Sequence, residues 1–307
     1  MQSSDNARTR REIDTAPTDE TQVPASDPLS RFRTLVGTGE GAVGGWLMLG
    51  SPLAAELATK QQFDYVVVDC QHGLNGQDRL IDIIGRWPEG GPLPLVRVPS
   101  IEGGWVGRAL DAGAAGVIVP MVNSRREAEA AAAASRFAPR GVRSYGPIRP
   151  YRHLGVNPST VNENVLCFVM IETLAGLECV DDICATPGID GVYIGPADLA
   201  LSLNLHPSKD TKHPVLLAAI HEIRDSCLRN NVVPAIHAMN GAMARTFLAD
   251  GFRMVTAVSD LTALRTGLAH ELLAARAGHD AAVTSIADEQ HYTGPLPYIR
   301  RPEDRTP

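Results

Sequence analysis

The stretches VLCFVMIET (165–173) and GVYIGPADL (191–199) are the most informative part of the sequence. Each begins with a continuous apolar run, which is typical of a parallel strand that is covered on both faces. An acidic residue follows each run, Glu172 in the first stretch and Asp198 in the second. Their separation suits one βαβ unit, whose two strands have their carboxyl ends at the same edge of the sheet. We therefore expect both carboxylates to open into one crevice.

Apolar runs of this kind recur along the chain and predict eight strands. They are GGWLML (44–49), FDYVVVDC (63–70), PLVRVP (94–99), GVIVPMV (116–122), VLCFVMIE (165–172), GVYIG (191–195), VVPAIHA (232–238) and FRMVTAV (252–258). Helical stretches lie between them, for example at 124–136 and 213–231, and Ser51 is the expected N-cap of another. A doubly wound sheet would usually carry a Gly-rich loop after its first strand, and this sequence has none. The α/β pattern therefore predicts a (β/α)8 TIM barrel.

The boundaries and composition are those expected of one globular domain with tails. We predict a disordered tail at 1–27, the barrel at 28–280, with an amphipathic helix at about 261–278, and an extension at 281–307. The 28 basic and 35 acidic residues give a net charge of −7, without a basic block interleaved with aromatics, so nucleic acid is not an expected partner. The tail lacks the apolar segment of a signal peptide, and no run reaches membrane-spanning length. The five cysteines form no CxxC pair, which favours a reducing, cytoplasmic location.

Polar residues at the carboxyl ends of barrel strands are the candidates for chemistry. Glu172 and Asp198 offer hard oxygen ligands to Mg²⁺ or Mn²⁺, which would act as a Lewis acid. The structural alternative is that each is an ion-pair partner or a helix cap. Gly195 and Pro196 lead into a helix whose first N–H groups, around Ala197, would bind a carboxylate. Together these features suggest a 2-oxo acid as substrate.

Other strand ends add a base, a cation and pocket walls. His72 lies just past a strand end and is a candidate proton acceptor. Arg97 lies within an apolar strand, so we expect it to face an anionic ligand or a carboxylate, and Asp69 is the simple alternative partner. The side chains that we expect to line the pocket without doing chemistry are Trp46, Met170 and His237, whereas core packing is the better interpretation of Met121.

A Schiff-base mechanism is not expected from the lysines. Such a mechanism needs a lysine in an apolar pocket at a strand end. The sequence has only Lys60, Lys209 and Lys212, and none of them lies in a strand-like run.

Several motifs in one order resemble the HpcH/HpaI aldolase family of metal-dependent class II pyruvate aldolases, which includes 4-hydroxy-2-oxoheptanedioate aldolase. The resemblance covers residues from about 40 to 275. The segments that carry it are GGWLMLGSPLAAEL, FDYVVVDCQHG, LVRVP, ALDAGAAGVIVPMV, APRGVRSYG, VMIET and GIDGVYIGPADLALSLN.

This resemblance implies a set of roles. Glu172 and Asp198 would be the metal ligands for Mg²⁺ or Mn²⁺, with Co²⁺ as a further candidate. His72 would be the base and Asp111 its dyad partner, Arg97 would stabilise the transition state, and the amide of Ala197 would hold the substrate carboxylate. The barrel would be of the phosphoenolpyruvate/pyruvate type. The family is typically a hexamer, a trimer of dimers, in which the C-terminal helix is exchanged between subunits.

The implied reaction is reversible cleavage of a 4-hydroxy-2-oxo acid to pyruvate and an aldehyde, through a metal-bound pyruvate enolate. Three positions depart from the family pattern: Gln71 stands where Glu is frequent, Met170 where Gln is frequent, and His237 where an aliphatic residue is common. They leave the substrate open, with His237 and Asp69 as candidates for the aldehyde pocket. The alternatives are a citrate-lyase-like lyase acting on an acyl-CoA, for which the Arg-rich segment 140–152 is the candidate cleft, and a ligand-binding barrel without turnover.

Overall fold

The computed structural model describes residues 27–102, 104–146, 153–208 and 212–276. Of the predicted N-terminal tail only Asp27 falls in these ranges, and the predicted extension at 281–307 lies outside them. In the described part of the chain, no helix is both long enough and apolar enough to span a lipid bilayer.

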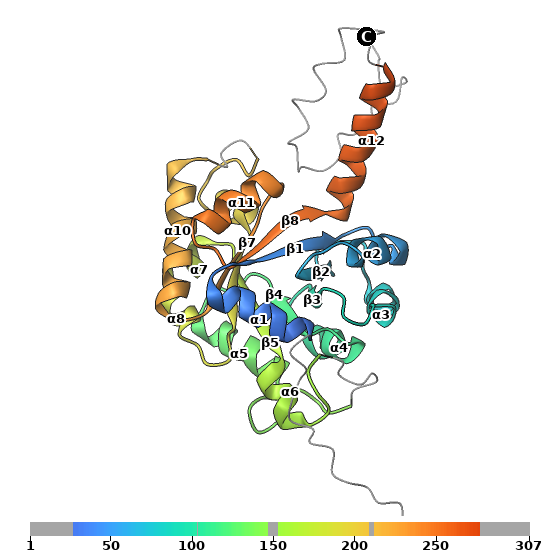
Figure 1. Ribbon diagram of the computed structural model, residues 1–307. Helices are drawn as coiled ribbons and strands as arrows, with labels where there is room; N and C mark the ends of the chain where they lie inside the picture. Colours follow the sequence, from blue (N-terminus) through green and yellow to red (C-terminus); the bar gives the residue numbers. More distant parts are fainter. Residues whose placement is uncertain (1–26, 103, 147–152, 209–211, 277–307) are drawn as a thin grey trace, which may run out of the picture.

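Eight parallel strands form a closed barrel in which each strand pairs with the next and the last pairs with the first (Figure 1). In chain order they are β1 (Ala42–Leu47), β2 (Tyr65–Asp69), β3 (Leu93–Arg97), β4 (Gly116–Val119), β5 (Leu166–Ile171), β6 (Gly191–Ile194), β7 (Val233–His237) and β8 (Met254–Ser259). The predicted TIM barrel is therefore confirmed, and every predicted strand overlaps an observed one.

Helices alternate with the strands around the barrel. They are α1 (Pro28–Thr38), α2 (Pro52–Thr59), α3 (Gln77–Gly85), α4 (Trp105–Ala112), α5 (Arg125–Ser135), α6 (Pro158–Asn164), α7 (Leu174–Glu178), α8 (Val180–Cys184), α9 (Pro196–Ser202), α10 (Pro214–Arg229), α11 (Gly241–Ala249) and α12 (Asp260–Arg276). Ser51 caps α2 as expected, since its hydroxyl accepts the N–H of Ala54 at 3.2 Å.

The barrel interior is filled by large side chains and closed at its amino end by α1. Phe32 of α1 contacts Tyr65 and Phe168 edge to face, with ring centroids 6.0 and 6.4 Å apart. Above them the hydroxyls of Tyr65 and Tyr193 both reach the Thr256 hydroxyl, at 3.1 and 2.5 Å. Because side chains alternate along a strand, Met170 and Glu172, two and four residues after Phe168, point to the same side as Phe168, into the barrel. The open end of the barrel is therefore its carboxyl end.

The described parts of the Arg-rich segment lie at the opposite end from the strand carboxyl ends. The segment leads from the end of α5 to the start of β5, so its described parts, 137–146 and 153–157, lie towards the amino ends of the strands. The helix that follows, α6, is tied to α1 by a hydrogen bond from Arg33 to the Glu163 carbonyl at 2.8 Å. Residues 147–152 lie outside the described ranges. An acyl-CoA cleft formed by the described parts of this segment would therefore lie away from the strand carboxyl ends, where the other candidate site residues are.

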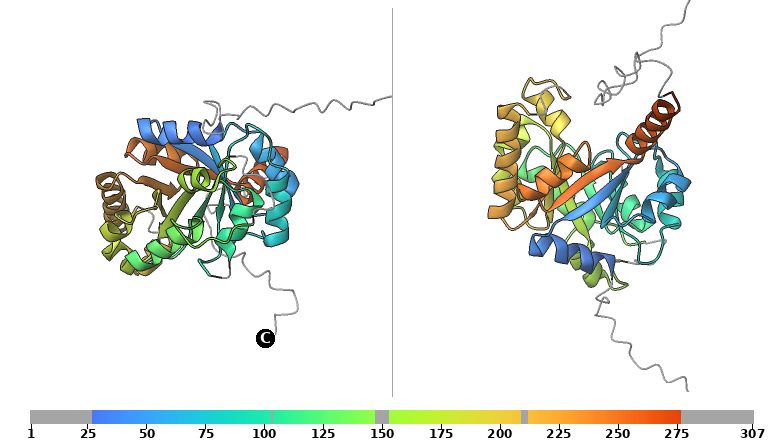
Figure 2. Two further views of the ribbon diagram at one scale, coloured as in Figure 1. Left: turned by 90° about the horizontal axis from the view of Figure 1, so that it is seen from below. Right: turned by 45° about the horizontal axis from the view of Figure 1, so that its top comes forward.

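The last helix, α12, points away from the barrel in Figure 1 and in the right-hand view of Figure 2. None of its residues is buried. Four leucines on it are each between 42 and 64% exposed: Leu261, Leu264, Leu268 and Leu272. They recur every three or four residues and therefore form one apolar stripe.

Candidate active site

A buried ion pair lies at the carboxyl ends of β2 and β3. The Asp69 carboxylate receives two hydrogen bonds from Arg97, from Nε at 2.9 Å and from a terminal nitrogen at 2.6 Å. Trp46 of β1 donates its indole N–H to the same carboxylate at 3.2 Å, and its ring lies 5.0 Å from the guanidinium carbon. The structure therefore shows Asp69, the simple alternative partner, paired with Arg97. Strands β1, β2 and β3 each contribute one residue to this rigid cluster.

The charge state of this cluster follows from its contacts. Burial alone would raise the pKa of Asp69, but the hydrogen bond and charge of Arg97, helped by the Trp46 N–H, hold it below its ordinary value. Asp69 is fully buried and Arg97 is 8% exposed. Asp69 is therefore ionised at neutral pH and faces the Arg97 guanidinium. The guanidinium remains a positive charge at the floor of the open end of the barrel.

Glu172 follows β5 and faces the start of α9. It is 2% exposed, and its Oε2 accepts the backbone N–H of Met121 at 3.0 Å. A Cβ at Gly195 would lie 2.4 Å from the other carboxylate oxygen, Oε1, so only glycine leaves room for Glu172 there. Burial, and next the negative charge of Asp198, raise the pKa of Glu172 to about 7. The Met121 N–H opposes this rise without cancelling it.

Asp198 lies on the first turn of α9, directly after β6, and its side chain is exposed. Since β5 pairs with β6 in parallel, with Ile171 opposite Ile194, Glu172 and Asp198 follow neighbouring strand ends. The N-cap residue of α9, Gly195, provides no side-chain acceptor for the first N–H groups of the helix. Those groups, including that of Ala197, are accordingly available to another acceptor.

His72 lies on the loop that follows β2, and its side chain is exposed. Asp69 shapes the start of this loop, because its Oδ1 accepts the backbone N–H groups of Gln71 at 3.0 Å and of His72 at 3.3 Å. The side-chain oxygen of Gln71 is buried and has no hydrogen-bond partner among the residues that the structure describes. His72 therefore belongs to the same end of the barrel as the acidic pair.

His237 and Met170 form parts of the interior wall. His237, at the end of β7, is half-buried and meets the Trp46 ring edge to face at 5.1 Å. Burial, and next the positive charge of Arg97, lower the pKa of His237 to about 4, so its imidazole is neutral at neutral pH. Met170 is 1% exposed and lies two residues before Glu172 on the same face of β5.

The described contact of Asp111, the predicted dyad partner of His72, is with Arg143. Asp111 lies on the last turn of α4, and its carboxylate pairs with Arg143 at 2.6 Å. Arg143 belongs to the segment that leads to the amino end of β5, where its guanidinium covers the Phe137 ring at 4.6 Å. The role of Asp111 as dyad partner of His72 stays a prediction.

The acidic pair fits a divalent cation. Two carboxylates with hard oxygens lie together, and one of them is buried so far that its ionised form is disfavoured, a cost that a cation would offset. Among the residues that the structure describes, no three His, Cys, Asp or Glu side chains are grouped to hold a metal. A cation at Glu172 and Asp198 would thus keep most of its coordination positions for water and substrate oxygens.

Two polar residues with specific contacts at this end were missed by the sequence reasoning. Asn75 donates its side-chain amide to the carbonyls of Leu47 and Asp69, both at 2.9 Å. Asp260, the first residue of α12, accepts backbone N–H groups from the loop after β1. Asp260 follows the eighth strand, so the strand-end rule that selected Glu172 would have found it. Asn75 gives no comparable signal, because an Asn in a loop is usually a turn residue.

The family model described as HpcH/HpaI aldolase/citrate lyase matches residues 43–266. A hydroxypyruvate/pyruvate aldolase of Rhizorhabdus wittichii is 37% identical over 81% of this chain and 100% of its own length. A 5-keto-4-deoxy-D-glucarate aldolase of Escherichia fergusonii is 32% identical over 78% of this chain and 93% of its own. Aldolases are carbon–carbon lyases, and this is the enzyme class that the chain shares with these relatives.

A solved structure agrees with the sequence comparisons. An HpcH/HpaI aldolase/citrate lyase family protein from Burkholderia cenocepacia matches 80% of this chain and 99% of its own with a TM-score of 0.74 and 30% identity. The barrel fold, the residues at its strand ends and these similarities all point to the same family. The chain belongs to the HpcH/HpaI aldolase/citrate lyase family.

Proposed function

We propose that this protein is a divalent-metal-dependent aldolase that reversibly cleaves a 4-hydroxy-2-oxo acid to pyruvate and an aldehyde. The observation that carries the proposal is the pair of carboxylates, Glu172 and Asp198, at neighbouring strand ends beside a buried Arg97. The names of the curated relatives, which are aldolases of hydroxypyruvate or pyruvate and of a keto-deoxy sugar acid, support a 2-oxo acid substrate.

The residues divide into those that bind and those that move a proton. Glu172 and Asp198 would hold Mg²⁺, Mn²⁺ or Co²⁺, which when bound supplies Lewis-acid polarisation of the keto oxygen. The free N–H groups at the start of α9, that of Ala197 among them, would bind the substrate carboxylate. These contacts would orient the 2-oxo acid at the open end of the barrel with its methyl carbon exposed to the second substrate.

His72 would remove or return the proton, and Arg97 would stabilise the oxygen on which negative charge develops. Arg97 suits this role because Asp69 and Trp46 hold its guanidinium rigidly, so that little reorganisation is needed when charge appears. His72 suits its role because it is exposed at the same end. We keep Asp111 as a candidate partner of His72 in the assembled protein.

His237 and Asp69 are our candidates for the aldehyde side of the pocket. A neutral His237 imidazole has one donor and one acceptor nitrogen. It therefore suits an aldehyde that bears a hydroxyl group better than an aldehyde that bears a charge. Met170 contributes an apolar surface beneath Glu172. The acyl-CoA alternative is less well supported, because the described parts of the Arg-rich segment lie at the other end of the barrel. The five cysteines are all free, which supports a reducing cytoplasmic location.

Exchange of the pyruvate methyl protons in deuterated water tests the function without knowledge of the aldehyde. The wild-type protein should catalyse exchange with Mn²⁺ and lose the activity when the metal is chelated. His72→Ala should slow exchange by roughly 10²–10⁴, the usual contribution of a general base. His221→Ala, at a half-exposed histidine on α10, serves as the control and should not change the rate. Wild-type protein without exchange would favour a barrel that binds ligands without turnover.

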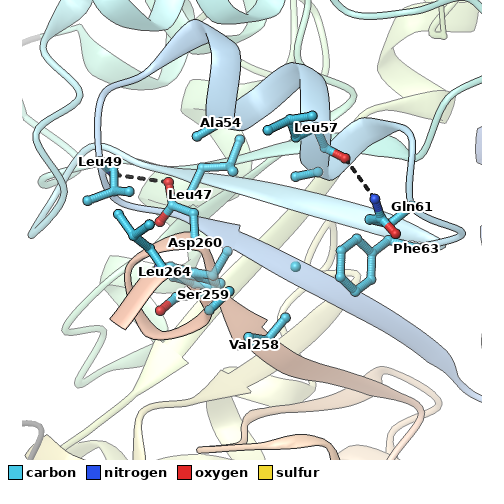
Figure 3. A pocket seen from close by; sticks show the side chains of 14 residues that line it. Leu47, Leu49, Ala54, Leu57, Gln61, Phe63, Val258, Ser259, Asp260 and Leu264 are labelled. Atoms are coloured by element: carbon cyan, nitrogen blue, oxygen red, sulfur yellow. Dashed lines mark hydrogen bonds between the residues drawn. The ribbon is translucent and has the colours of Figure 1, made fainter. Parts of the chain in front are cut away.

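We also propose that α12 packs against a second copy of this chain. A groove of about 380 Å³ lies between α2 and the start of α12, and it is lined mainly by apolar side chains such as Leu47, Leu57 and Phe63 (Figure 3). Leu264 of the stripe lines this groove in its own chain, and the exposed leucines farther along α12, Leu268 and Leu272, would fill the same groove of another copy. Exchange of the helix would bury both surfaces and would form the dimer unit of the expected hexamer.

Light scattering on the purified protein tests the assembly. Leu268→Glu, in the middle of the stripe, should reduce the molar mass towards that of the single chain. Glu271→Gln, at a neighbouring position that is also exposed, should leave the mass unchanged. A Leu268→Glu protein with the wild-type mass would exclude the stripe as the contact.

A further inference from the structure

The loop that carries His72 is fixed to the loop that follows β1. We call residues 70–76 the His72 loop and residues 48–51 the β1 loop. The N–H of Leu74 donates to the Met48 carbonyl at 2.6 Å. The Asn75 side-chain amide donates to the Leu47 carbonyl at the end of β1 and to the Asp69 carbonyl at the end of β2. Asn75 is 2% exposed, so these hydrogen bonds are protected from competing water.

The two loops are also packed too closely to slide. Gly50 has φ +63°, and a Cβ there would lie 2.5 Å from the Leu74 carbonyl oxygen. A Cβ at Gly73 of the His72 loop would lie 3.1 Å from the Cα of Met48 in the β1 loop. Any displacement of the β1 loop therefore reaches the His72 loop through backbone contact.

Asp260 holds the β1 loop from its other side. Its Oδ1 accepts the N–H of Met48 at 2.8 Å, and its Oδ2 accepts the N–H of Leu49 at 3.1 Å, the bond drawn in Figure 3. Hydrogen bonds to a carboxylate are stronger than neutral ones. Met48 is thus shared: its N–H is bound by Asp260 and its carbonyl by Leu74 of the His72 loop.

Asp260 is also the first residue of α12. Because no residue of that helix is buried within the chain, the helix is attached to the barrel at its first residue more than along its length. Asp260 also lines the groove between α2 and α12. A continuous set of contacts therefore runs from the base of α12 through Met48 to the His72 loop.

We propose that Asp260 is a positioning residue that holds the His72 loop through the β1 loop, and so couples the base of α12 to acid–base chemistry at the open end of the barrel. The catalytic part rests on the proposed function of His72. The mechanical part does not, because it concerns only the hydrogen bonds between Asp260, the β1 loop and the His72 loop.

Amide hydrogen exchange tests the mechanical part without an activity assay. In Asp260→Ala the amides of Met48, Leu49 and Leu74 should exchange at least about tenfold faster than in the wild-type protein. Met48 and Leu49 lose their carboxylate acceptors, and the hydrogen bond from Leu74 to the Met48 carbonyl loosens. Asp260→Asn retains one neutral acceptor and should give an intermediate effect, which keeps the test valid if the alanine variant folds poorly. Glu271→Gln, an exposed acid on the same helix, is the control and should exchange as wild type.

Kinetics of the metal-loaded enzyme test the catalytic part. Asp260→Ala should lower kcat by roughly 10–100-fold, the usual effect of displacing a catalytic group by about 1 Å or of losing an outer contact, with KM for pyruvate unchanged. The loss should disappear in the background of His72→Ala, because both changes would act on one group. A merely structural role would lower activity equally in both backgrounds.

Three results would overturn the proposal: wild-type exchange at Leu74 in Asp260→Ala, an unchanged kcat, or a loss that adds fully to that of His72→Ala. A wild-type protein without aldolase activity would instead refute the proposed function. Faster exchange at Leu74 in Asp260→Ala would then still establish the link between α12 and the His72 loop.

Discussion

Replacement of Glu172 by glutamine should make the metal-free protein more stable at alkaline pH. The pKa of Glu172 is raised from 4.5 to about 7, and the side chain is only 2% exposed, so solvent screens it little. A difference of about 2.5 units at about 1.4 kcal/mol per unit corresponds to ~3 kcal/mol of unfolding free energy. Glutamine has the same shape, stays neutral, and its carbonyl can accept the Met121 N–H that the carboxylate now accepts.

The direction of the pH effect follows from proton counting. Because the folded protein binds this proton more tightly than the unfolded chain, the favourable contribution is fully present below pH 4.5 and is lost as the pH rises to about 7. Urea unfolding in EDTA at about pH 4, 6 and 8 measures it. Relative to the glutamine variant, the wild-type protein should lose ~3 kcal/mol across this range.

Controls separate this carboxylate from all others. Glu129→Gln, at a half-exposed surface position of α5, should follow the wild-type pH profile. Addition of Mn²⁺ at about pH 8 should stabilise the wild-type protein and not Glu172→Gln, since a ligand stabilises the state that binds it. If wild type and Glu172→Gln show parallel pH profiles in EDTA, the burial argument is refuted.

Three further changes have expected outcomes. Gly195→Ala should abolish metal-dependent proton exchange, because its Cβ would lie 2.4 Å from a Glu172 oxygen, whereas Gly241→Ala, where space is open, should be active; equal activities would contradict the argument. Asp69→Asn should lower the free energy of unfolding by about 3–5 kcal/mol in urea titrations, because it leaves the Arg97 charge buried without its counterion, and a loss below about 1 kcal/mol would show that the pair is dispensable. Borohydride added with pyruvate should leave the protein mass unchanged, because no lysine lies in a predicted strand; a covalent adduct would establish Schiff-base chemistry.

The fold and the site residues at strand ends could be predicted from the sequence because both depend on local patterns. Continuous apolar runs identify parallel buried strands, and a polar residue directly after such a run can only lie at the open end of a barrel. This rule placed Glu172, Asp198 and His72 at one end. It also anticipated that Arg97 needs a carboxylate or an anion, and the structure supplies Asp69.

The rest depends on geometry that local patterns do not encode. Arg143, the partner of Asp111, lies 32 residues farther along the chain, in the segment between α5 and β5. The amide of Asn75 connects two strand ends only because two glycines allow the loops to approach. The leucines of α12 show a helical stripe in the sequence, but its exposure could be seen only once the helix was placed relative to the barrel.

Titration of the metal-free protein with Mn²⁺, followed by electron paramagnetic resonance, tests most directly whether the paired carboxylates bind a cation. The wild-type protein should bind one ion per chain. Glu172→Gln and Asp198→Asn should each bind it at least about 100-fold more weakly, since loss of even an outer contact usually weakens metal binding by about 10–100-fold. Wild-type affinity in both variants would contradict the account.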